Sequence, residues 1–321
     1  METNAYERET GNSQSFLEKE KYCERQFANG GPFWHFFTDG REQEIVFTNS
    51  DDFKFGMNQL ALPALICNVR IIAFAVMDNH IHVIAQCPMI CGNQMFEQFS
   101  GKIARYLKSV HRPIARNLFK LQQPIEITNL KMLRSEIVYV IRNGFVANPN
   151  YTPVSYPWGS GSVFFQPLSA SNPMPFNSIP FKTKRAILRS RVFELPETML
   201  VEDGLILPQC FCDFRYGESF FRDAHHYFHM LSKDLEARGE IAKRLNDTVF
   251  YTDEELYSAI SLHTRKIYGI SNPQLVEAGQ KIEIAKKMHH DYNCSNKQIQ
   301  RLLKLDSSVI NSLFPQSSTP R

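Results

Sequence analysis

The sequence predicts an α+β protein in which a mixed half precedes a helical half. Over roughly the first 165 residues, runs rich in β-branched and aromatic residues alternate with segments of helical period. Beyond about Val201 the apolar residues recur almost entirely at helical spacing. We therefore expect a disordered leader (1–30), a mixed domain (31–165), a Pro- and Ser-rich linker (166–185) and a helical domain (186–321).

The bulk composition is that of an ordinary globular protein. Of the 321 residues, 43% are hydrophobic and 21% are charged. No apolar run is long enough to cross a bilayer, and the polar start does not have the apolar core of a secretory signal. The seven cysteines include no Cys-x-x-Cys pair, which favours reduced thiols over a zinc knuckle. We expect a cytoplasmic protein with no membrane partner.

The first predicted elements form a hairpin followed by a short helix. Residues 32–40 are typical of a strand that runs into a turn, and residues 44–49 are the expected return strand. Ser50 and the acidic pair after it suit the start of a helix, and Pro63 limits how far that helix is expected to run.

The next elements are two strands and two amphipathic helices. Residues 70–77 are rich in β-branched and aromatic side chains, and residues 80–86 return after an Asp-Asn turn. Apolar residues then recur at helical spacing over 93–110 and again over 130–145. The inner stripe of the second helix is Leu133, Ile137 and Ile141.

Two histidines on the second of these strands are candidate metal ligands. Side chains alternate along a strand, so His80 and His82 project from the same face, one pleat apart. Two imidazoles in that position are suited to share one metal ion. The alternative is a pair satisfied by backbone or water, which is the commoner outcome for an isolated His-x-His.

A tyrosine on the later helix is a candidate nucleophile. Tyr139 and Asn143 are four residues apart and share one helical face, which we expect to be turned away from the apolar stripe. On that face the tyrosine has no core to fill. The alternative is an exposed aromatic ring that packs on a neighbouring loop.

Three motifs together resemble a known family. AVMDNHIHVIAQ (75–86) resembles the His-hydrophobic-His signature of the HUH single-tyrosine transposases. IVYVIRNGFVANP (137–149) resembles their catalytic-tyrosine helix, and YPWGSG (156–161) resembles the segment that follows it. Among these insertion-sequence-200-like enzymes, the REP-associated tyrosine transposases are the most similar. The resemblance covers roughly 33–165 and implies a ferredoxin-like antiparallel sheet with helices on one face, the HUH nuclease domain.

The resemblance also implies a function and a set of site residues. Tyr139 would be the nucleophile, and His80, His82 and Asn143 the ligands of Mg²⁺ or Mn²⁺. The activity would be that of a metal-dependent single-strand DNA endonuclease and strand transferase. It would form a 5′-phosphotyrosine link on single-stranded or hairpin DNA, in a nucleoid-associated protein with a homodimer as a possible assembly. One departure is Asn143-Gly144, where the family usually has asparagine-proline.

Two other function classes remain open. A domesticated regulator would keep the fold and bind DNA without cutting it, although the presence of both histidines and the tyrosine argues against that class. A replication initiator or a relaxase would share the histidine pair. Initiators usually place a lysine near the tyrosine and relaxases add a third histidine, whereas positions 143 and 86 here are Asn and Gln.

Basic residues indicate where DNA would lie. One helix face and its continuation form a basic strip, and a second basic run has no acidic residue to balance it. A solvated helix face explains the strip equally well. Residues 294–314 have the pattern of a helix-turn-helix, although an ordinary helical hairpin fits as well. The expected DNA-binding residues are Lys102, Arg105, Arg112 and Arg116 on the strip, and Lys182, Lys184 and Arg185 in the second run.

Overall fold

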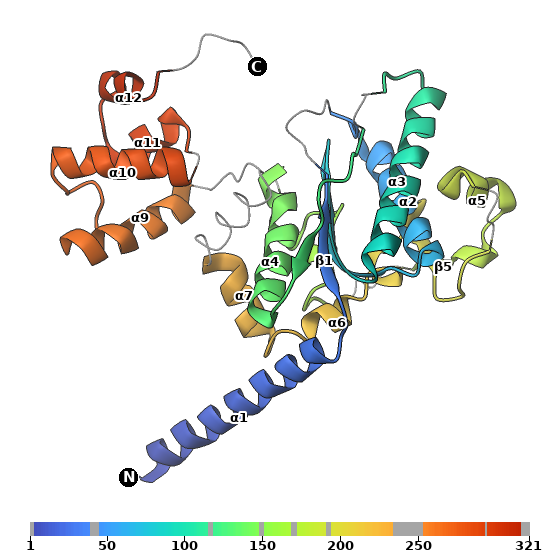
Figure 1. Cartoon of the computed structure of the whole chain (residues 1–321), viewed down its shortest axis with the longest axis horizontal. Coiled ribbons are helices and arrows are strands. Elements are labelled where there is room, and N and C mark those ends of the chain that lie inside the picture. Colours follow the sequence, from blue (N-terminus) through green and yellow to red (C-terminus); the bar gives the residue numbers. More distant parts are fainter. Residues whose placement is uncertain are drawn as a thin grey trace. The chain divides into compact units, whose positions relative to one another are not determined.

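The computed structural model divides the chain into two compact units, residues 1–232 and 233–321 (Figure 1). We describe each unit by itself. The residues that the structure describes are 3–38, 45–114, 118–147, 151–167, 172–190, 194–233, 253–292 and 294–315.

A four-stranded antiparallel sheet lies at the centre of the first unit. Its strands are β1 (Phe33–Phe37), β2 (Arg70–Val76), β3 (Ile81–Gln86) and β4 (Ile125–Ile127). Their order is β2-β3-β1-β4, and each neighbouring pair is antiparallel. The predicted α+β class is therefore confirmed.

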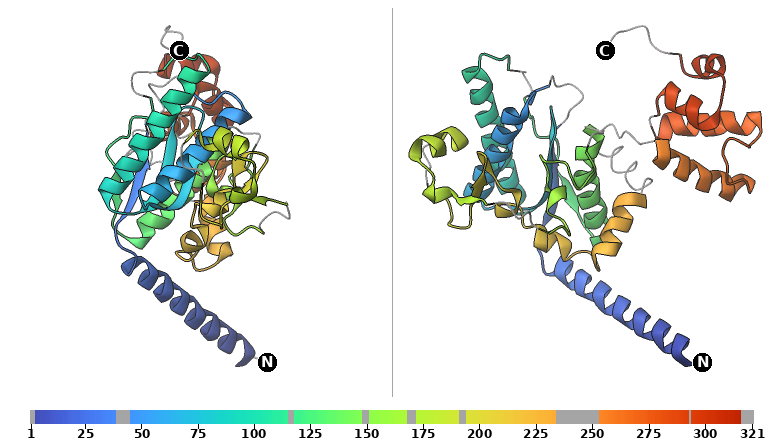
Figure 2. Two further views of the ribbon diagram at one scale, coloured as in Figure 1. Left: turned by 90° about the vertical axis from the view of Figure 1, so that its right-hand side faces the viewer. Right: turned by 180° about the vertical axis from the view of Figure 1, so that it is seen from behind.

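Helices cover both faces of this sheet, whereas we expected them on one face. Figures 1 and 2 show α2 (Ser50–Ile66) and α3 (Met89–Ser109) on one side of the sheet and α4 (Leu130–Ala147) on the other. Successive side chains of β1 point to opposite faces. The Phe36 ring stacks on Phe96 of α3, while the His35 ring bonds to Glu136 of α4. Every residue of β2 from Ile71 to Val76 is buried, so the side chains on both faces of this strand are covered by other elements.

Two predictions about the first elements are wrong. Residues 45–48 form no strand, because the amides of Val46 and Phe47 both donate to the Asp78 carbonyl at 2.8 Å instead of to a neighbouring strand. Helix α2 is not the short helix that we expected, because it has 17 residues and continues through Pro63 to Ile66.

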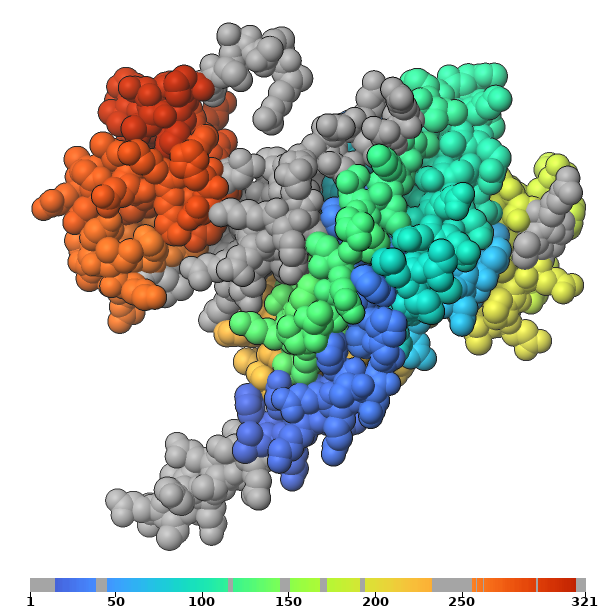
Figure 3. All heavy atoms as spheres, viewed as in Figure 1, coloured from blue at the N-terminus to red at the C-terminus, as the bar shows by residue number. Residues whose placement is uncertain are grey.

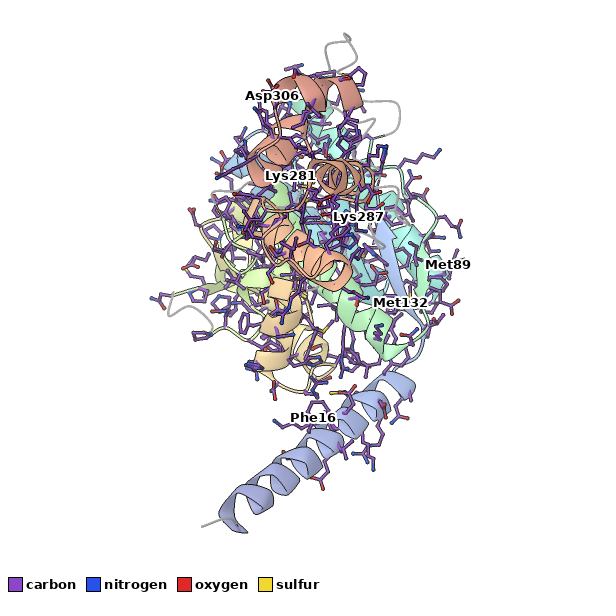
Figure 4. The ribbon with its side chains drawn as sticks, turned by 90° about the vertical axis from the view of Figure 1, so that its left-hand side faces the viewer. Phe16, Met89, Met132, Lys281, Lys287 and Asp306 are labelled. Carbon is purple, nitrogen blue, oxygen red and sulfur yellow. The ribbon has the colours of Figure 1, made fainter. Side chains whose placement is uncertain are left out.

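The leader that we expected to be disordered contains a helix. Residues 3–28 form α1 (Thr3–Ala28). The Arg134 guanidinium of α4 bonds to Glu20 at 2.7 Å, and the Phe27 ring stacks on Phe33 of β1 with centroids 5.2 Å apart. Phe16 projects from α1 (Figure 4), and Arg222 lies over its ring at 4.1 Å.

The expected linker and the region after it also contain regular structure. Residues 174–206 include a small antiparallel sheet that packs against α2, and short helices follow up to the end of the first unit. The remaining elements of this unit are η1 (Ser160–Ser162), β5 (Met174–Pro175), η2 (Phe176–Ser178), α5 (Phe181–Leu188), β6 (Leu200–Glu202), β7 (Leu205–Ile206), η3 (Pro208–Cys210), α6 (Phe214–Glu218) and α7 (Ala224–Lys233).

The described part of the second unit is helical. It contains α9 (Asp253–Tyr268), α10 (Ala278–Asp291), α11 (Asn296–Leu303) and α12 (Ser307–Leu313), and α11 packs against the other three. Figure 4 labels Lys281 and Lys287 on α10.

The predicted helical hairpin over 294–314 is present. The Ser295 side chain caps α11, as predicted from its position. Lys304 then turns the chain in a left-handed conformation with φ of 50°. The Asp306 carboxylate, labelled in Figure 4, accepts from the Ser308 amide and starts α12.

Within the described ranges, no helix has both the length and the apolar character that a membrane span requires. All seven cysteines are free thiols.

Candidate functional site

The sheet brings both predicted histidines to the side covered by α4. His82 of β3 pairs with Phe37 of β1, and His35 pairs with Ile84, so these four side chains share one face of the sheet. His80 lies immediately before β3, and its ring is perpendicular to that of His82 with centroids 5.1 Å apart. The Nδ1 atom of His80 lies 2.7 Å from the Asn79 side-chain oxygen.

A buried chain of polar groups connects His82 to α4. The Nδ1 atom of His82 lies 3.0 Å from Nε2 of His35, and Nδ1 of His35 lies 2.9 Å from a Glu136 carboxylate oxygen. None of the three side chains is more than 1% exposed. His35 and Glu136 were not predicted from the sequence. The available signals were a histidine inside an aromatic strand and a glutamate beside the apolar stripe of a helix.

Tyr139 lies beside both buried histidines. Its ring centroid is 5.7 Å from that of His82 and 6.2 Å from that of His35, with edge-on geometry in each case. The side chain is 1% exposed, so the prediction that it faces away from the core is wrong. The reason is that α4 packs against β2, β3 and β4 on one side and against α1 elsewhere, which buries Val138 and Val140 as well.

Asn143 is buried one helical turn after Tyr139. It is 7% exposed, and the hydrogen bonds described above for His80 and His82 go to Asn79 and His35. The next residue, Gly144, packs directly against Tyr156. A Cβ atom at position 144 would lie 2.2 Å from Cδ1 of the Tyr156 ring, so this contact requires glycine.

The YPWGSG segment lies along the outer edge of β2. The Val76 amide donates to the Trp158 carbonyl and the Tyr156 hydroxyl donates to the Val76 carbonyl, both at 2.8 Å. The Phe74 amide donates to the Ser160 hydroxyl at 3.0 Å. Burial raises the pKa of Tyr156. The three motifs, which are separate in the sequence, are therefore neighbours in the fold.

The donor set at this site suits a metal ion only in part. Within the described ranges, no group of three or more His, Cys, Asp or Glu side chains is arranged to hold a metal. The Nδ1 atoms of His80 and His82 are already engaged, so each ring would bind an ion through Nε2. A third protein ligand would have to be a residue of another type, such as Asn143 through its amide oxygen.

The predicted basic strip on α3 is not a continuous row of exposed charges. The outer side of α3 forms part of the surface (Figure 3), and Arg105 is exposed there. Lys102 is half-buried and donates to the Gln59 side chain at 3.1 Å, and burial lowers the pKa of Lys102 to about 8. Arg112 binds the Asp52 carboxylate at 2.7 Å, and Arg116 lies outside the described residues.

The second basic run is better exposed. Lys182 and Arg185 are exposed on α5. Lys184 donates to the Asn177 carbonyl at 2.8 Å, and its ammonium group lies 5.6 Å from the centre of the Phe176 ring. Of the described candidates for DNA contact, Arg105, Lys182 and Arg185 are thus the exposed ones.

No protein-family model, curated protein or solved structure matches this chain.

Proposed function

We propose that this protein is a metal-dependent single-strand DNA endonuclease and strand transferase that acts through Tyr139. The observation that carries the proposal is the edge-on contact between the Tyr139 and His82 rings, at 5.7 Å between centroids. It places the candidate nucleophile beside a candidate metal ligand that lies more than fifty residues away in the sequence. The close packing of Gly144 on Tyr156 supports the same grouping of motifs.

The connectivity of the sheet supports the architecture that the family resemblance implies. The chain runs β1-α2-β2-β3-α3-β4, and the strand order is β2-β3-β1-β4 with antiparallel neighbours. Ferredoxin-like sheets have the same connectivity and strand order, which supports the proposal. We therefore propose that the first unit is built on an HUH nuclease domain, with α4 as the helix that carries the tyrosine.

The proposed chemistry is a transesterification. The Tyr139 hydroxyl oxygen forms a bond to the scissile phosphorus as the bond to the 3′-oxygen breaks; the hydroxyl loses its proton, and the departing oxygen gains one. Mg²⁺ or Mn²⁺, when bound at His80 and His82, would polarise the phosphate oxygens. The 5′-phosphotyrosine link keeps the energy of the broken ester, so another 3′-hydroxyl can reverse the step without ATP.

One observation favours a second candidate, the non-cutting DNA-binding regulator. Tyr139 is 1% exposed, and a DNA strand reaches its hydroxyl only after neighbouring segments move aside. In an enzyme this movement accompanies binding of DNA. In a regulator the tyrosine stays in the core.

The test uses Tyr139→Phe, with Tyr151→Phe as the matched control. Tyr151 is partly exposed and contacts Tyr156 near the same helix. With hairpin-bearing single strands and Mn²⁺, the parent and the control should form a protein–DNA adduct that survives denaturant. Tyr139→Phe should bind the DNA about as tightly and form no adduct, because the attacking oxygen is gone. An adduct that persists in Tyr139→Phe would identify another nucleophile, and the absence of an adduct in the parent would favour the regulator.

A further inference from the structure

We propose that Glu136 and His35 are positioning residues that fix the ring and the tautomer of His82. The inference rests on the proposed function, because it assigns these residues a role toward the metal ligand His82. It goes further in naming two side chains that no sequence motif of the site includes.

The hydrogen-bond chain has a direction that the buried carboxylate sets. A carboxylate only accepts hydrogen bonds, so Nδ1–H of His35 donates to Glu136 across 2.9 Å. The other nitrogen of a neutral His35 ring then accepts, and Nδ1–H of His82 donates to it across 3.0 Å. This leaves the lone pair of His82 on Nε2, which is the atom that a metal ion needs.

The position of His82 is also fixed by the rings around it. The Phe37 ring stacks on His82 with centroids 6.1 Å apart and an angle of 9° between the planes. The Tyr139 ring approaches the His82 ring edge-on. Together with the bond to His35, these contacts hold the His82 ring in one rotamer.

A purely structural role explains this chain poorly. His35 and Glu136 are both 0% exposed, and burying three polar side chains between β1, β3 and α4 stabilises a protein less than apolar packing does. A carboxylate that orients a histidine through its second nitrogen is, by contrast, the usual support of a metal-binding imidazole. Here a second imidazole stands between the carboxylate and the ligand.

The experiment compares three variants of the full chain. Glu136→Gln replaces an acceptor with an amide that can either donate or accept, so the chain loses its fixed direction. His35→Gln keeps an oxygen that can accept from His82, whereas His35→Leu removes the acceptor. His225→Gln changes an exposed histidine and is the control.

Two measurements are made on each protein, and neither requires cutting activity. Nitrogen-15 NMR of the metal-free protein reports the His82 tautomer, and titration with Mn²⁺ followed by electron paramagnetic resonance reports affinity. The parent, His225→Gln and His35→Gln should keep the hydrogen on Nδ1 of His82. Glu136→Gln and His35→Leu should give mixed tautomers and bind Mn²⁺ roughly 10- to 100-fold more weakly.

The outcomes separate this inference from the proposed function. Unchanged tautomer and Mn²⁺ affinity in both Glu136→Gln and His35→Leu would overturn the inference, as would a hydrogen on Nε2 of His82 in the parent. A parent that shows the expected tautomer and binds Mn²⁺, yet forms no adduct with DNA, would leave the inference standing and refute the nuclease. If Glu136→Gln does not fold, the contrast between His35→Gln and His35→Leu decides.

Discussion

Asp52 joins three segments of the first unit. Its side chain, 2% exposed, accepts from the Thr48 amide at 2.9 Å, from Arg112 at 2.7 Å and from the Tyr106 hydroxyl. Burial alone would raise the pKa of Asp52, but the hydrogen bonds from Tyr106, Thr48 and Arg112 together lower it below the ordinary value. Burial and the bond to Asp52 raise the pKa of Tyr106 to about 12.

This cluster makes stability depend on pH. A carboxyl whose pKa is lowered by folding stabilises the protein above its unfolded pKa of about 4, and the contribution is lost as the pH falls through the folded value. Asp52→Asn should therefore be about 1–3 kcal/mol less stable at pH 7 and should lose less stability on acidification than the parent. Urea unfolding at pH 7 and at pH 4 measures both effects. Asp51→Asn, at the exposed neighbouring position, should have the same stability as the parent at both pH values. If Asp52→Asn loses as much stability as the parent between pH 7 and pH 4, other carboxyl groups cause the loss.

At the residue scale, the sequence named candidate site residues only where a motif was present. His80, His82 and Tyr139 were predicted as candidates because short patterns contain them. His35 and Glu136 were missed because each lies alone in its own segment, and the fold brings them together across 101 residues. The prediction that Tyr139 faces away from the core was wrong, because periodicity identifies one apolar stripe of a helix and does not show how many other elements cover that helix.

Elements with a complete periodic pattern were predicted within a few residues. This holds for β2, β3, α3 and α4, where packing partners and local propensity agree. Residues 44–49 also have strand-like composition, yet the amides of Val46 and Phe47 there both donate to one carbonyl of the turn before β3. A strand-like composition is not enough to form a strand, because a strand also needs hydrogen bonds to a neighbouring strand.

The turn between α11 and α12 predicts where a glycine would raise the stability of this hairpin and where it would lower it. Lys304 has φ of 50°, a conformation that costs a side chain free energy and costs glycine none. Lys304→Gly should therefore stabilise the hairpin by about 0.5–1 kcal/mol. Lys297→Gly, at an exposed position inside α11, should destabilise it by a similar amount.

Hydrogen exchange of the α11 and α12 amides in the full chain measures both changes. Slower exchange in Lys304→Gly and faster exchange in Lys297→Gly is the expected pair of results. Faster exchange in both variants would mean that a contact of the Lys304 side chain stabilises the hairpin by more than the left-handed backbone at this residue costs.

At the scale of the whole molecule, the first unit extends well beyond the resembling segment. The Asn58 side chain of α2 bonds to the Gly204 carbonyl and to the Ile206 amide, both at 2.8 Å. The Arg134 guanidinium donates to the Phe220 carbonyl at 2.5 Å. Residues 172–232 thus complete the cover of α2 and α4.

These contacts predict the shortest chain that folds. Residues 1–232 should unfold in one cooperative transition and keep the adduct-forming activity proposed for Tyr139. Residues 1–165 would expose the apolar and polar groups that residues 172–232 now cover, so this fragment should not fold stably. Circular dichroism and calorimetry of the two fragments test this. A folded fragment 1–165 with a sharp transition would show that the later segments are an accessory layer.

The segment along β2 has a consequence for how copies of this protein behave in a crowded cell. An exposed strand edge is a template on which another chain can add a strand and start aggregation. Here the outward amides of Phe74 and Val76 are bonded to the YPWGSG segment, and the Ile71 carbonyl accepts from the Asp213 amide. That side of the sheet is closed to strand addition by the protein's own chain, so β2 offers no template on which aggregates of this protein could grow.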